Sequence, residues 1–217
     1  MTIDVGRLIG AVSREITTRD YEGRPARVLV ATRVYDTTQD DLWDALTNPE
    51  RIPRWFLPIE GDLRLGGTYQ LTGNAGGQIL RCEAPRHFGL TWSMQGQVSW
   101  VNVDLSPEPS GGTRLRLEHI AHVPDEFWDQ FGPGAVGVGW DQAMLGLGRH
   151  LSGERKLDPH AFMAWVSSDE GRAFIRQSGD AWCASSIAAG TDAAAARAAA
   201  ERTRQFYTGD TADSAVR

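Results

Sequence analysis

Three side chains near the end of one predicted strand have the residue types of a metal site. They are Glu118, His119 and His122, with the two histidines three positions apart. On a β-strand, side chains three positions apart point to opposite faces of the sheet. The strand would therefore separate the two imidazoles that a metal ion needs together, and no metal is expected.

His119 on its own has two readings. It lies among apolar residues at an inward position, where it could act as a general base or donate a hydrogen bond to a bound ligand. The other reading is a buried histidine whose hydrogen bonds are satisfied within the core. A second well-placed catalytic group is not evident, so an enzyme reading depends on His119 alone.

The glycine-rich segments do not have the form of nucleotide sites. Gly73-Asn-Ala-Gly-Gly77 leads into a strand and lacks the helix N-terminus that would hold a phosphate, so we interpret it as a hairpin turn. The chain contains no Gly-x-Ser-x-Gly, Walker or dinucleotide-binding motif. No cofactor is expected.

Aromatic residues are the other outstanding feature, with eight tryptophans in 217 residues. Trp43, Trp55, Trp92 and Trp140 fall on segments that we expect to converge, either as core or as the lining of a ligand cavity. Arg54, Arg81 and His119 are the polar groups that could orient a ligand in such a cavity.

A long helix from Pro133 to Leu151 is expected to organise these residues. Trp140, Met144, Leu147 and Leu151 recur at helical spacing and form an apolar stripe that a sheet could cover. Four glycines lie in or beside the stripe, at positions 137, 139, 146 and 148. They indicate either close packing against the sheet, with the first two in the entry turn, or unfilled space between helix and sheet.

The sheet itself is predicted from short β-branched and aromatic runs separated by turn residues. A helix or loop around residues 5–12 and an extended piece at 13–20 precede it. The predicted strands cover 27–35, 62–65, 68–72, 78–83, 87–94, 98–105 and 113–121. Successive hairpins make an antiparallel meander. Period-two alternation directs one set of side chains inward: Phe88, Leu90, Trp92, Met94, Val101, Val103, Leu105, Leu115, Leu117 and His119.

A short helix interrupts the strands. Thr37 or Thr38 is its predicted N-cap, and the helix covers Gln39 to Leu46. The segment from Glu50 to Ile59 that follows is broken by proline but carries Trp55 and Phe56, which must be buried somewhere.

Residues after Leu151 are predicted to form a separate helical tail. Helix starts are expected at Asp158, at Ser167 to Glu170 and at Asp192, and the last residues from Gly209 are expected to fray. The predicted organisation is a grip domain over residues 1–152 and a docked helical extension over 153–217. The tail packs on the grip domain or pairs with a second copy in a homodimer.

Composition excludes several classes of protein. The net charge is −6 and the basic residues are scattered, which argues against a nucleic-acid partner. No run of about 18 apolar residues or signal peptide is found, so we expect no membrane span and a cytoplasmic location. Cys82 and Cys183 lie far apart and are expected to be reduced thiols.

The order of motifs resembles a known family. The motifs are Leu42-Trp43-x-Ala45-Leu46-Thr47-x-Pro49 with Trp55-Phe56, the turn Glu83-Ala84-Pro85-Arg86, Leu90-Thr91-Trp92, Thr113-x-Leu115-x-Leu117-x-His119, and Gly139-Trp140-x-x-x-Met144-x-x-Leu147-x-x-x-Leu151. Over Arg27 to Leu151 the chain resembles bacterial proteins similar to the C-terminal domain of the activator of Hsp90 ATPase, within the START-like (SRPBCC) superfamily. Met144 stands where leucine is more usual.

The resemblance implies an α+β helix-grip (START-like) fold. In this fold a curved antiparallel sheet wraps around a long helix and leaves an apolar cavity between them. Here a C-terminal helical segment is appended. The resemblance implies no single function, because this fold serves lipid carriers, cyclases, hormone receptors and co-chaperones.

Three functions are therefore considered. The first is binding of an apolar or aromatic small molecule between sheet and helix, and the others are a polyketide cyclase or hydrolase that uses His119 and a co-chaperone-like interaction module. The expected ligand-binding residues are Trp43, Trp55, Phe56, Arg81, Trp92, Val103, Leu117, His119, Trp140, Met144 and Leu147.

Overall fold

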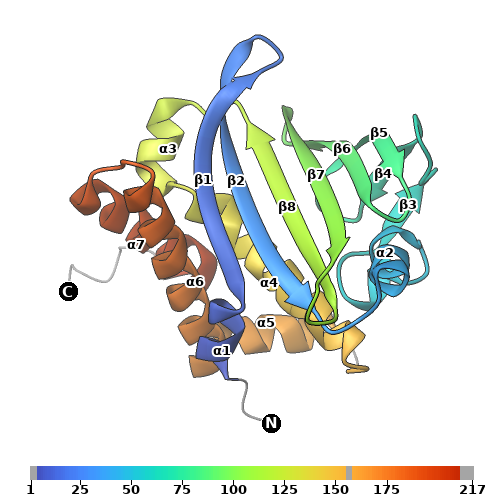
Figure 1. Ribbon diagram of the computed structural model, residues 1–217. Helices are drawn as coiled ribbons and strands as arrows, with labels where there is room; N and C mark the ends of the chain where they lie inside the picture. The colour runs from blue at the N-terminus through green and yellow to red at the C-terminus, as the bar shows by residue number, and fades with distance from the viewer. Residues whose placement is uncertain (1–3, 155–157, 211–217) are drawn as a thin grey trace. The chain divides into compact units, whose positions relative to one another are not determined.

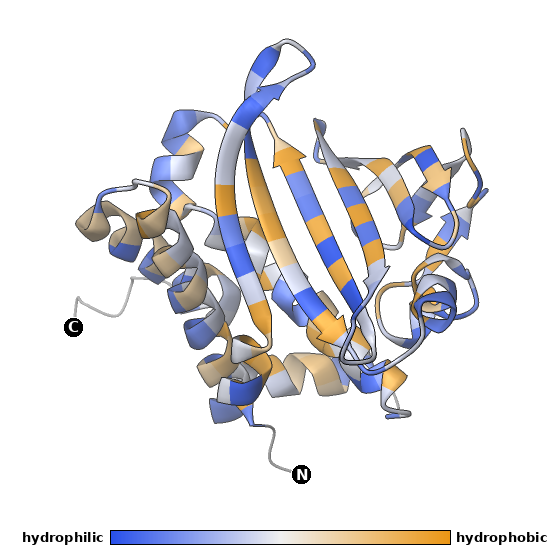
Figure 2. Ribbon diagram, viewed as in Figure 1, coloured by the Kyte–Doolittle hydropathy of each residue, from blue (hydrophilic) through white to orange (hydrophobic). Residues whose placement is uncertain are grey.

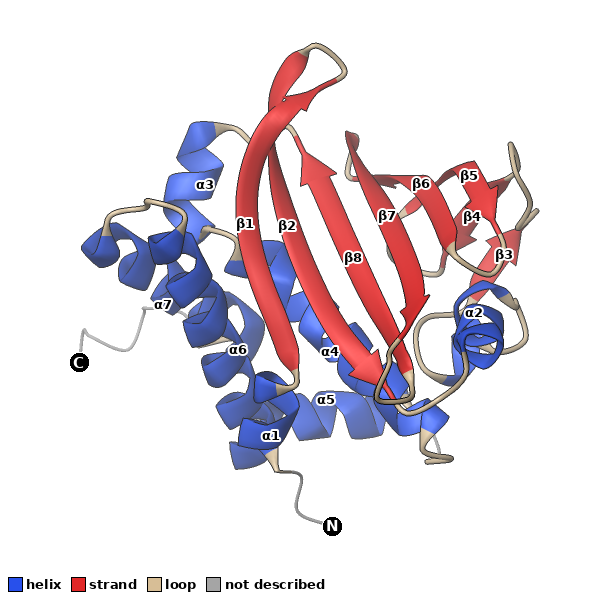
Figure 3. Cartoon of the chain, in the orientation of Figure 1, coloured by secondary structure: helices blue, strands red, loops and turns tan. Residues whose placement is uncertain are grey.

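The computed structural model describes residues 4–154 and 158–210, and its elements are labelled in Figure 1 and coloured by type in Figure 3. The described residues form two compact units. The sheet unit contains residues 18–122 and 143–154, and the helical unit contains residues 4–17, 123–142 and 158–210. A domain boundary between residues 152 and 153 stays a prediction.

An antiparallel sheet in the order β1-β2-β8-β7-β6-β5-β4-β3 is the main element of the sheet unit, to which β1 contributes only residues 18–21. Its strands are β1 (Val12–Tyr21), β2 (Arg24–Tyr35), β3 (Ile59–Gly61), β4 (Thr68–Leu71), β5 (Gly76–Glu83), β6 (His87–Met94), β7 (Gln97–Pro107) and β8 (Thr113–Ala121). Six of the predicted strands are confirmed, with ends shifted by a few residues at most. Antiparallel pairing follows from the short turns between successive strands.

The strand predicted at residues 62–65 is wrong. That segment forms a turn, and β3 lies just before it, with Ile59 paired to Leu71 and Gly61 paired to Tyr69. Gly61 has a φ of +121°, and a Cβ atom there would lie 2.2 Å from the carbonyl oxygen of Thr68. The chain leaves the sheet at Gly61 because only glycine fits that backbone and that close approach.

Side chains alternate between the two faces of the sheet, as the banding of β7 and β8 in Figure 2 shows. On β8, Leu115, Leu117 and His119 are buried on the inner face. The outer face is not wholly polar, because Val28, Ile120 and Trp100 lie side by side in register and are buried there. The predicted alternation is therefore correct, but part of the outer face has a small apolar core of its own.

Helix α2 (Gln39–Thr47) is capped by Thr38, whose side-chain oxygen accepts a hydrogen bond from the backbone N–H of Asp41 at 3.3 Å. Thr37 instead donates to the Asp41 carboxylate at 2.6 Å. We expect Thr38→Ala to lower the free energy of unfolding by about 1 kcal/mol, because the N–H loses its partner. Chemical denaturation measures this, with Thr38→Ser, which keeps the capping oxygen, as the control. A loss of equal size in Thr38→Ser would contradict the assignment of the cap to Thr38.

The remaining described helices lie mainly in the helical unit. They are α1 (Val5–Gly10), α3 (Asp125–Phe131), α4 (Gly134–Leu151), α5 (Pro159–Ser167), α6 (Asp169–Ala188) and α7 (Ala193–Thr208), and the 3₁₀ helix η1 (Ile52–Arg54) lies in the sheet unit. None of the helices in the described ranges is long and apolar enough to cross a bilayer. Helix α3 was not expected from the sequence.

The caps of the tail helices follow the predicted starts closely. Asp158 accepts from the N–H of Ala161, and Ser168 accepts from the N–H of Gly171, one residue later than the capping box predicts. Asp192 caps α7, and Gly209 ends it in a left-handed conformation. The remaining residues predicted to fray, 211–217, lie outside the described residues.

Helix α4 contributes residues 134–142 to the helical unit, and two of its glycines lie there. The close-packing alternative placed both in the entry turn, which is wrong, because the helix already begins at Gly134. A Cβ atom at Gly137 would lie 2.3 Å from the ring of Trp182, and one at Gly139 would lie 3.2 Å from the hydroxyl oxygen of Tyr207. These glycines allow two aromatic side chains of the tail helices to approach the α4 backbone.

The other two glycines of α4 lie in the sheet unit and have the same role. A Cβ atom at Gly146 would lie 2.6 Å from the carbonyl oxygen of Trp55, and one at Gly148 would lie 2.9 Å from the guanidinium of Arg33. Close packing therefore explains all four glycines, but only Gly148 packs against a strand of the sheet, as was predicted for the set. The alternative, in which they leave unfilled space, is wrong at these positions.

Candidate functional site

The inner face of β6 carries large apolar side chains that are only half-buried. Phe88, Leu90 and Trp92 alternate along this strand and face inward. The Phe88 ring meets Trp43 of α2 edge-on at 5.9 Å between ring centroids, and the Trp92 ring meets His119 at 6.3 Å. Part of the apolar surface on the core side of the sheet thus stays accessible.

Trp55 and Phe56 form a second aromatic pair, in the segment after η1 and next to α2. Their rings stack at 5.3 Å, and both side chains are half-buried. The indole N–H of Trp55 donates to the carbonyl oxygen of Ala45 at 2.9 Å, which fixes the ring against α2. The proline-broken segment therefore holds these two aromatics in place without a regular helix.

His119 is buried beneath Trp92. Its Nε2 lies 2.8 Å from the hydroxyl oxygen of Ser99, and that hydroxyl donates to the carbonyl oxygen of Trp92 at 3.0 Å. Because the single Ser99 hydrogen is used in this way, Nε2 of His119 must carry the proton that it shares with Ser99. Burial lowers the pKa of His119 to about 4, so the imidazole is neutral near pH 7.

Several predicted ligand residues are brought together in the sheet unit. Val103, Leu117, Met144 and Leu147 are buried there. The Met144 carbonyl accepts hydrogen bonds from two inner-face residues of β2, Arg33 at 3.0 Å and Tyr35 at 3.1 Å. Trp140 belongs to the helical unit, so its place in the site stays a prediction.

The two arginines proposed to orient a ligand do not join this group. Arg81 lies on the outer face, where it is exposed and pairs with Glu83 at 2.7 Å. Arg54 is exposed and donates to the carbonyl oxygen of Glu50. The bulge between Ile79 and Arg81 changes the alternation along β5. A period-two reading of the sequence could not detect that change.

The two histidines of the metal-like motif also have separate partners. His122 interacts with the carbonyl oxygen of Pro25 through Nδ1 at 2.9 Å and meets Trp100 edge-on. His119 meets Trp92 on the inner face, whereas Trp100 belongs to the outer-face cluster. The strand separates the two imidazoles, as its alternation predicts.

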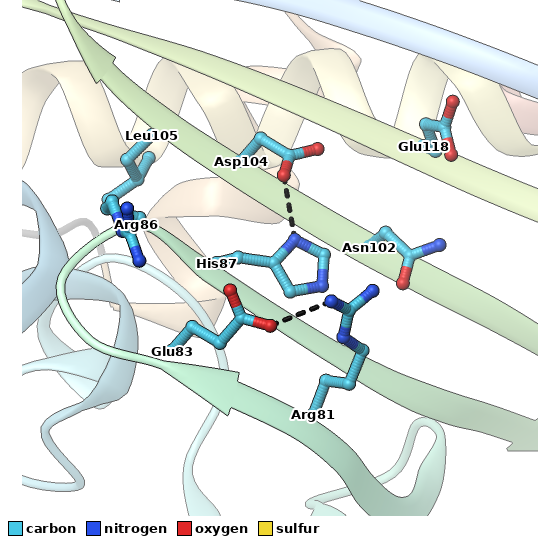
Figure 4. Close-up of a pocket in the computed structure, with 8 residues that line it drawn as sticks. All are labelled: Arg81, Glu83, Arg86, His87, Asn102, Asp104, Leu105 and Glu118. Atoms are coloured by element: carbon cyan, nitrogen blue, oxygen red, sulfur yellow. Dashed lines mark hydrogen bonds and ion pairs between the residues drawn. The ribbon is translucent and has the colours of Figure 1, made fainter.

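A hollow of about 440 Å³ lies on the outer face of the same sheet. Figure 4 shows its lining, with His87 in the middle, Arg86 toward one end and Asn102 toward the other. The lining residues are Arg81, Glu83, Arg86, His87, Asn102, Asp104, Leu105 and Glu118. Nδ1 of His87 lies 2.7 Å from the Asp104 carboxylate.

His87 and this hollow were not predicted from the sequence. His87, Gly89 and Thr91 alternate with apolar residues on β6, which is the ordinary pattern of a solvated sheet face. The pairing of His87 with Asp104 joins positions 17 residues apart through the register of β6 and β7. Only the pairing of the predicted strands could have suggested it.

Comparisons with known proteins identify the family. The family model described as Activator of Hsp90 ATPase homolog 1-like protein matches residues 36–152, which is more than half of the chain. A search of curated proteins finds no match. The crystal structure of CalU16 from Micromonospora echinospora is 35% identical and covers 81% of this chain and 98% of its own, with a TM-score of 0.65.

The solution structure of CalU16 gives the same result, with a TM-score of 0.68 at 33% identity over 83% of this chain and 97% of its own. Because this match covers 83% of the chain, the similarity to CalU16 extends beyond residues 36–152. PFC0360w, an HSP90 activator from Plasmodium falciparum, shares the fold at 22% identity and a TM-score of 0.50, over 59% of this chain and 99% of its own. The α+β helix-grip fold is confirmed, and the chain belongs to the family of Activator of Hsp90 ATPase homolog 1-like proteins.

Proposed function

We propose that this protein binds an apolar, aromatic small molecule against the inner face of its sheet. One observation carries the proposal, namely that Phe88, Leu90 and Trp92 face the interior and yet are only half-buried. Protein interiors are close-packed, so large apolar side chains on a core-facing surface normally have full contacts. Partly accessible aromatic surface of this kind is typical of ligand sites.

Half-buried aromatics on two neighbouring elements support the same function. Trp43 presents ring surface beside β6, as its contact with Phe88 indicates, and Trp55 and Phe56 add a half-buried ring pair next to α2. Aromatic rings bind an aromatic partner more strongly than an aliphatic one. Offset-stacked and edge-on contacts between rings contribute favourable energy in addition to that of the apolar area buried. Membership of this family is consistent with ligand binding. The preference for an aromatic ligand is our proposal.

The two other candidate functions have less support. Neutral His119, hydrogen-bonded to Ser99, is better suited to orient a polar end of a ligand than to remove a proton, because its pKa of about 4 makes it a weak base. The likeness to an Hsp90 activator is one of fold alone and supports no co-chaperone function.

Leu90→Trp is the first test. The added ring should occupy the accessible surface of the inner face, so most of the fluorescence increase that the neutral dye Nile red shows with wild type should be lost. Because the space is open, stability should not fall by the roughly 1–3 kcal/mol that overpacking a dense core costs. Dye titration and a thermal melt measure the two effects.

Val34→Trp is the matched control. Val34 lies on the opposite face of β2 in the same unit and is 46% exposed, so the same bulky side chain meets solvent there. Its dye binding should equal that of wild type. Failure of wild type to bind the dye, or equal loss in both variants, would contradict the proposed function.

A further inference from the structure

Nε2 of His87 lines the outer-face hollow and is buried without a hydrogen-bond partner in the described ranges. The exposed guanidinium of Arg86 and the partly exposed side-chain amide of Asn102 line the same hollow, and neither has a hydrogen-bond or ion-pair partner among the described residues. The His87 side chain is only 13% exposed, and its Nε2 is buried. A buried polar atom without a partner is costly, so it indicates that something outside the chain completes the site.

The carboxylates that line the hollow all have cationic partners, and one lining arginine remains without a carboxylate partner. Glu83 pairs with Arg81 at 2.7 Å, and Glu118 pairs with Arg19 at 3.0 Å and with Arg116 at 2.8 Å. Asp104 accepts from His87 and lies 3.9 Å from Arg116. Every carboxylate of the lining thus has a partner.

Arg86 is the lining cation for which no carboxylate partner is found among the described residues. A guanidinium offers five N–H donors in a planar arrangement that matches a carboxylate. The charge balance therefore favours a ligand with a single negative charge.

Asp104 also determines what the imidazole of His87 offers to a ligand. An ionised carboxylate accepts hydrogen bonds, so Nδ1 of His87 carries the proton between them. In the neutral ring, Nε2 is then a hydrogen-bond acceptor. Because Nε2 is buried in this structure, a ligand hydroxyl group that donates to it must displace the lining side chains over it.

Gly89 leaves room for the Asn102 side chain beside His87. It lies between Arg81 and Asn102 in the register of β5, β6 and β7. A Cβ atom at this position would lie 2.6 Å from the amide oxygen of Asn102 and 3.7 Å from Nε2 of His87. Any other residue would displace the side chain of Asn102, which lines the hollow.

We propose that this hollow binds a small hydroxycarboxylate, with its carboxylate on Arg86 and its hydroxyl donating to Nε2 of His87. The amide of Asn102 binds the remaining polar atoms of the ligand. The site lies on the opposite face of the sheet from the apolar surface and does not depend on the function proposed for that surface.

The probes are L-lactate and 3-hydroxybutyrate, each compared with the acid that lacks the hydroxyl, propionate and butyrate. These anions are too small and polar for an aromatic surface to hold. Imidazole resonances of His87, followed by NMR during titration, should shift with at least one hydroxy acid. The matched acid should bind about fivefold more weakly, since one hydrogen bond is lost.

Two variants test the residues directly. Arg86→Gln should weaken binding about tenfold or more, because a hydrogen bond to a charged group is lost. Arg114→Gln is its control, because Arg114 also lies on the outer face but pairs with Glu108 away from the hollow. Gly89→Ala should abolish the His87 shifts.

The proposal is overturned if neither hydroxy acid shifts the His87 resonances. It is also overturned if Arg86→Gln binds as well as Arg114→Gln. If Gly89→Ala does not fold, His87→Phe replaces it, and retention of hydroxy-acid binding by that variant overturns the proposal equally.

Discussion

Arg14→Leu should lower the free energy of unfolding by about 3–5 kcal/mol, because it leaves a buried carboxylate without its counter-ion. Arg14 and Asp141 lie in the helical unit with side chains 5% and 1% exposed, and Nη2 of Arg14 is 3.0 Å from Oδ2 of Asp141. The same oxygen accepts hydrogen bonds from Ser178 and from the Trp182 indole at 3.1 Å. Urea denaturation followed by circular dichroism measures the loss.

Protonation of Asp141 provides a second signature of this pair. Burial raises the pKa of Asp141, and the Arg14 guanidinium beside it opposes that rise. Without Arg14 the pKa should rise further, so protonation stabilises the folded variant more than the wild type as the pH falls. The stability deficit of Arg14→Leu should therefore shrink toward pH 5.

Arg19→Leu is the matched control on the same strand, β1. Arg19 pairs with Glu118, but its side chain is 43% exposed, so water screens the pair and the loss should stay below about 1 kcal/mol. The double variant Arg14→Leu with Asp141→Asn should be less destabilised than Arg14→Leu, because the neutral amide needs no counter-ion and its oxygen still accepts from Ser178 and the Trp182 indole. A loss below 1 kcal/mol for Arg14→Leu would mean that the pair is not buried in solution.

This ion pair shows what the sequence could not predict. Arg14 and Asp141 are separated by 127 positions, and Asp141 lies outside the predicted apolar stripe of the long helix. The local sequence pattern does not distinguish a solvent-exposed aspartate from a buried aspartate that pairs with an arginine on another element. The partners of Gly137 and Gly148 were hidden in the same way, because they also come from distant segments.

The sheet could be predicted because its signals are local. Alternation and turn residues placed β6 and β8 at their observed bounds, and they assigned Trp92 and His119 to the inner face. The same logic failed for Arg81, where a bulge shifts the alternation, and it had no way to distinguish His87 from an ordinary polar residue of the outer face. The other residues of the inner-face surface and of the outer-face hollow are brought together by the strand register. That register depends on contacts across the sheet, which a local sequence pattern does not contain.

His119 is the predicted residue whose environment can be tested most directly in solution. Its pKa is lowered by burial from the ordinary value of 6.5 to about 4. In the unfolded chain the imidazole takes up a proton below about pH 6.5, whereas in the folded protein it stays neutral down to about pH 4. The unfolded state therefore binds more protons in this range, and stability must fall as the pH is lowered through it.

The expected size of this effect is about 3 kcal/mol between pH 6.5 and pH 4, since one pKa unit corresponds to about 1.4 kcal/mol. His119→Gln removes the titrating group and keeps a polar side chain beside Ser99, so its stability should fall by correspondingly less over the same range. Urea denaturation of both proteins at several pH values measures the difference in their free energies of unfolding. The contributions of the other titrating groups are the same in both proteins and cancel in this difference. Parallel curves for the two proteins would mean that His119 is accessible to protons when folded. In that case proton transfer by His119, and with it the enzyme reading, would regain support over its use as a neutral hydrogen-bonding group.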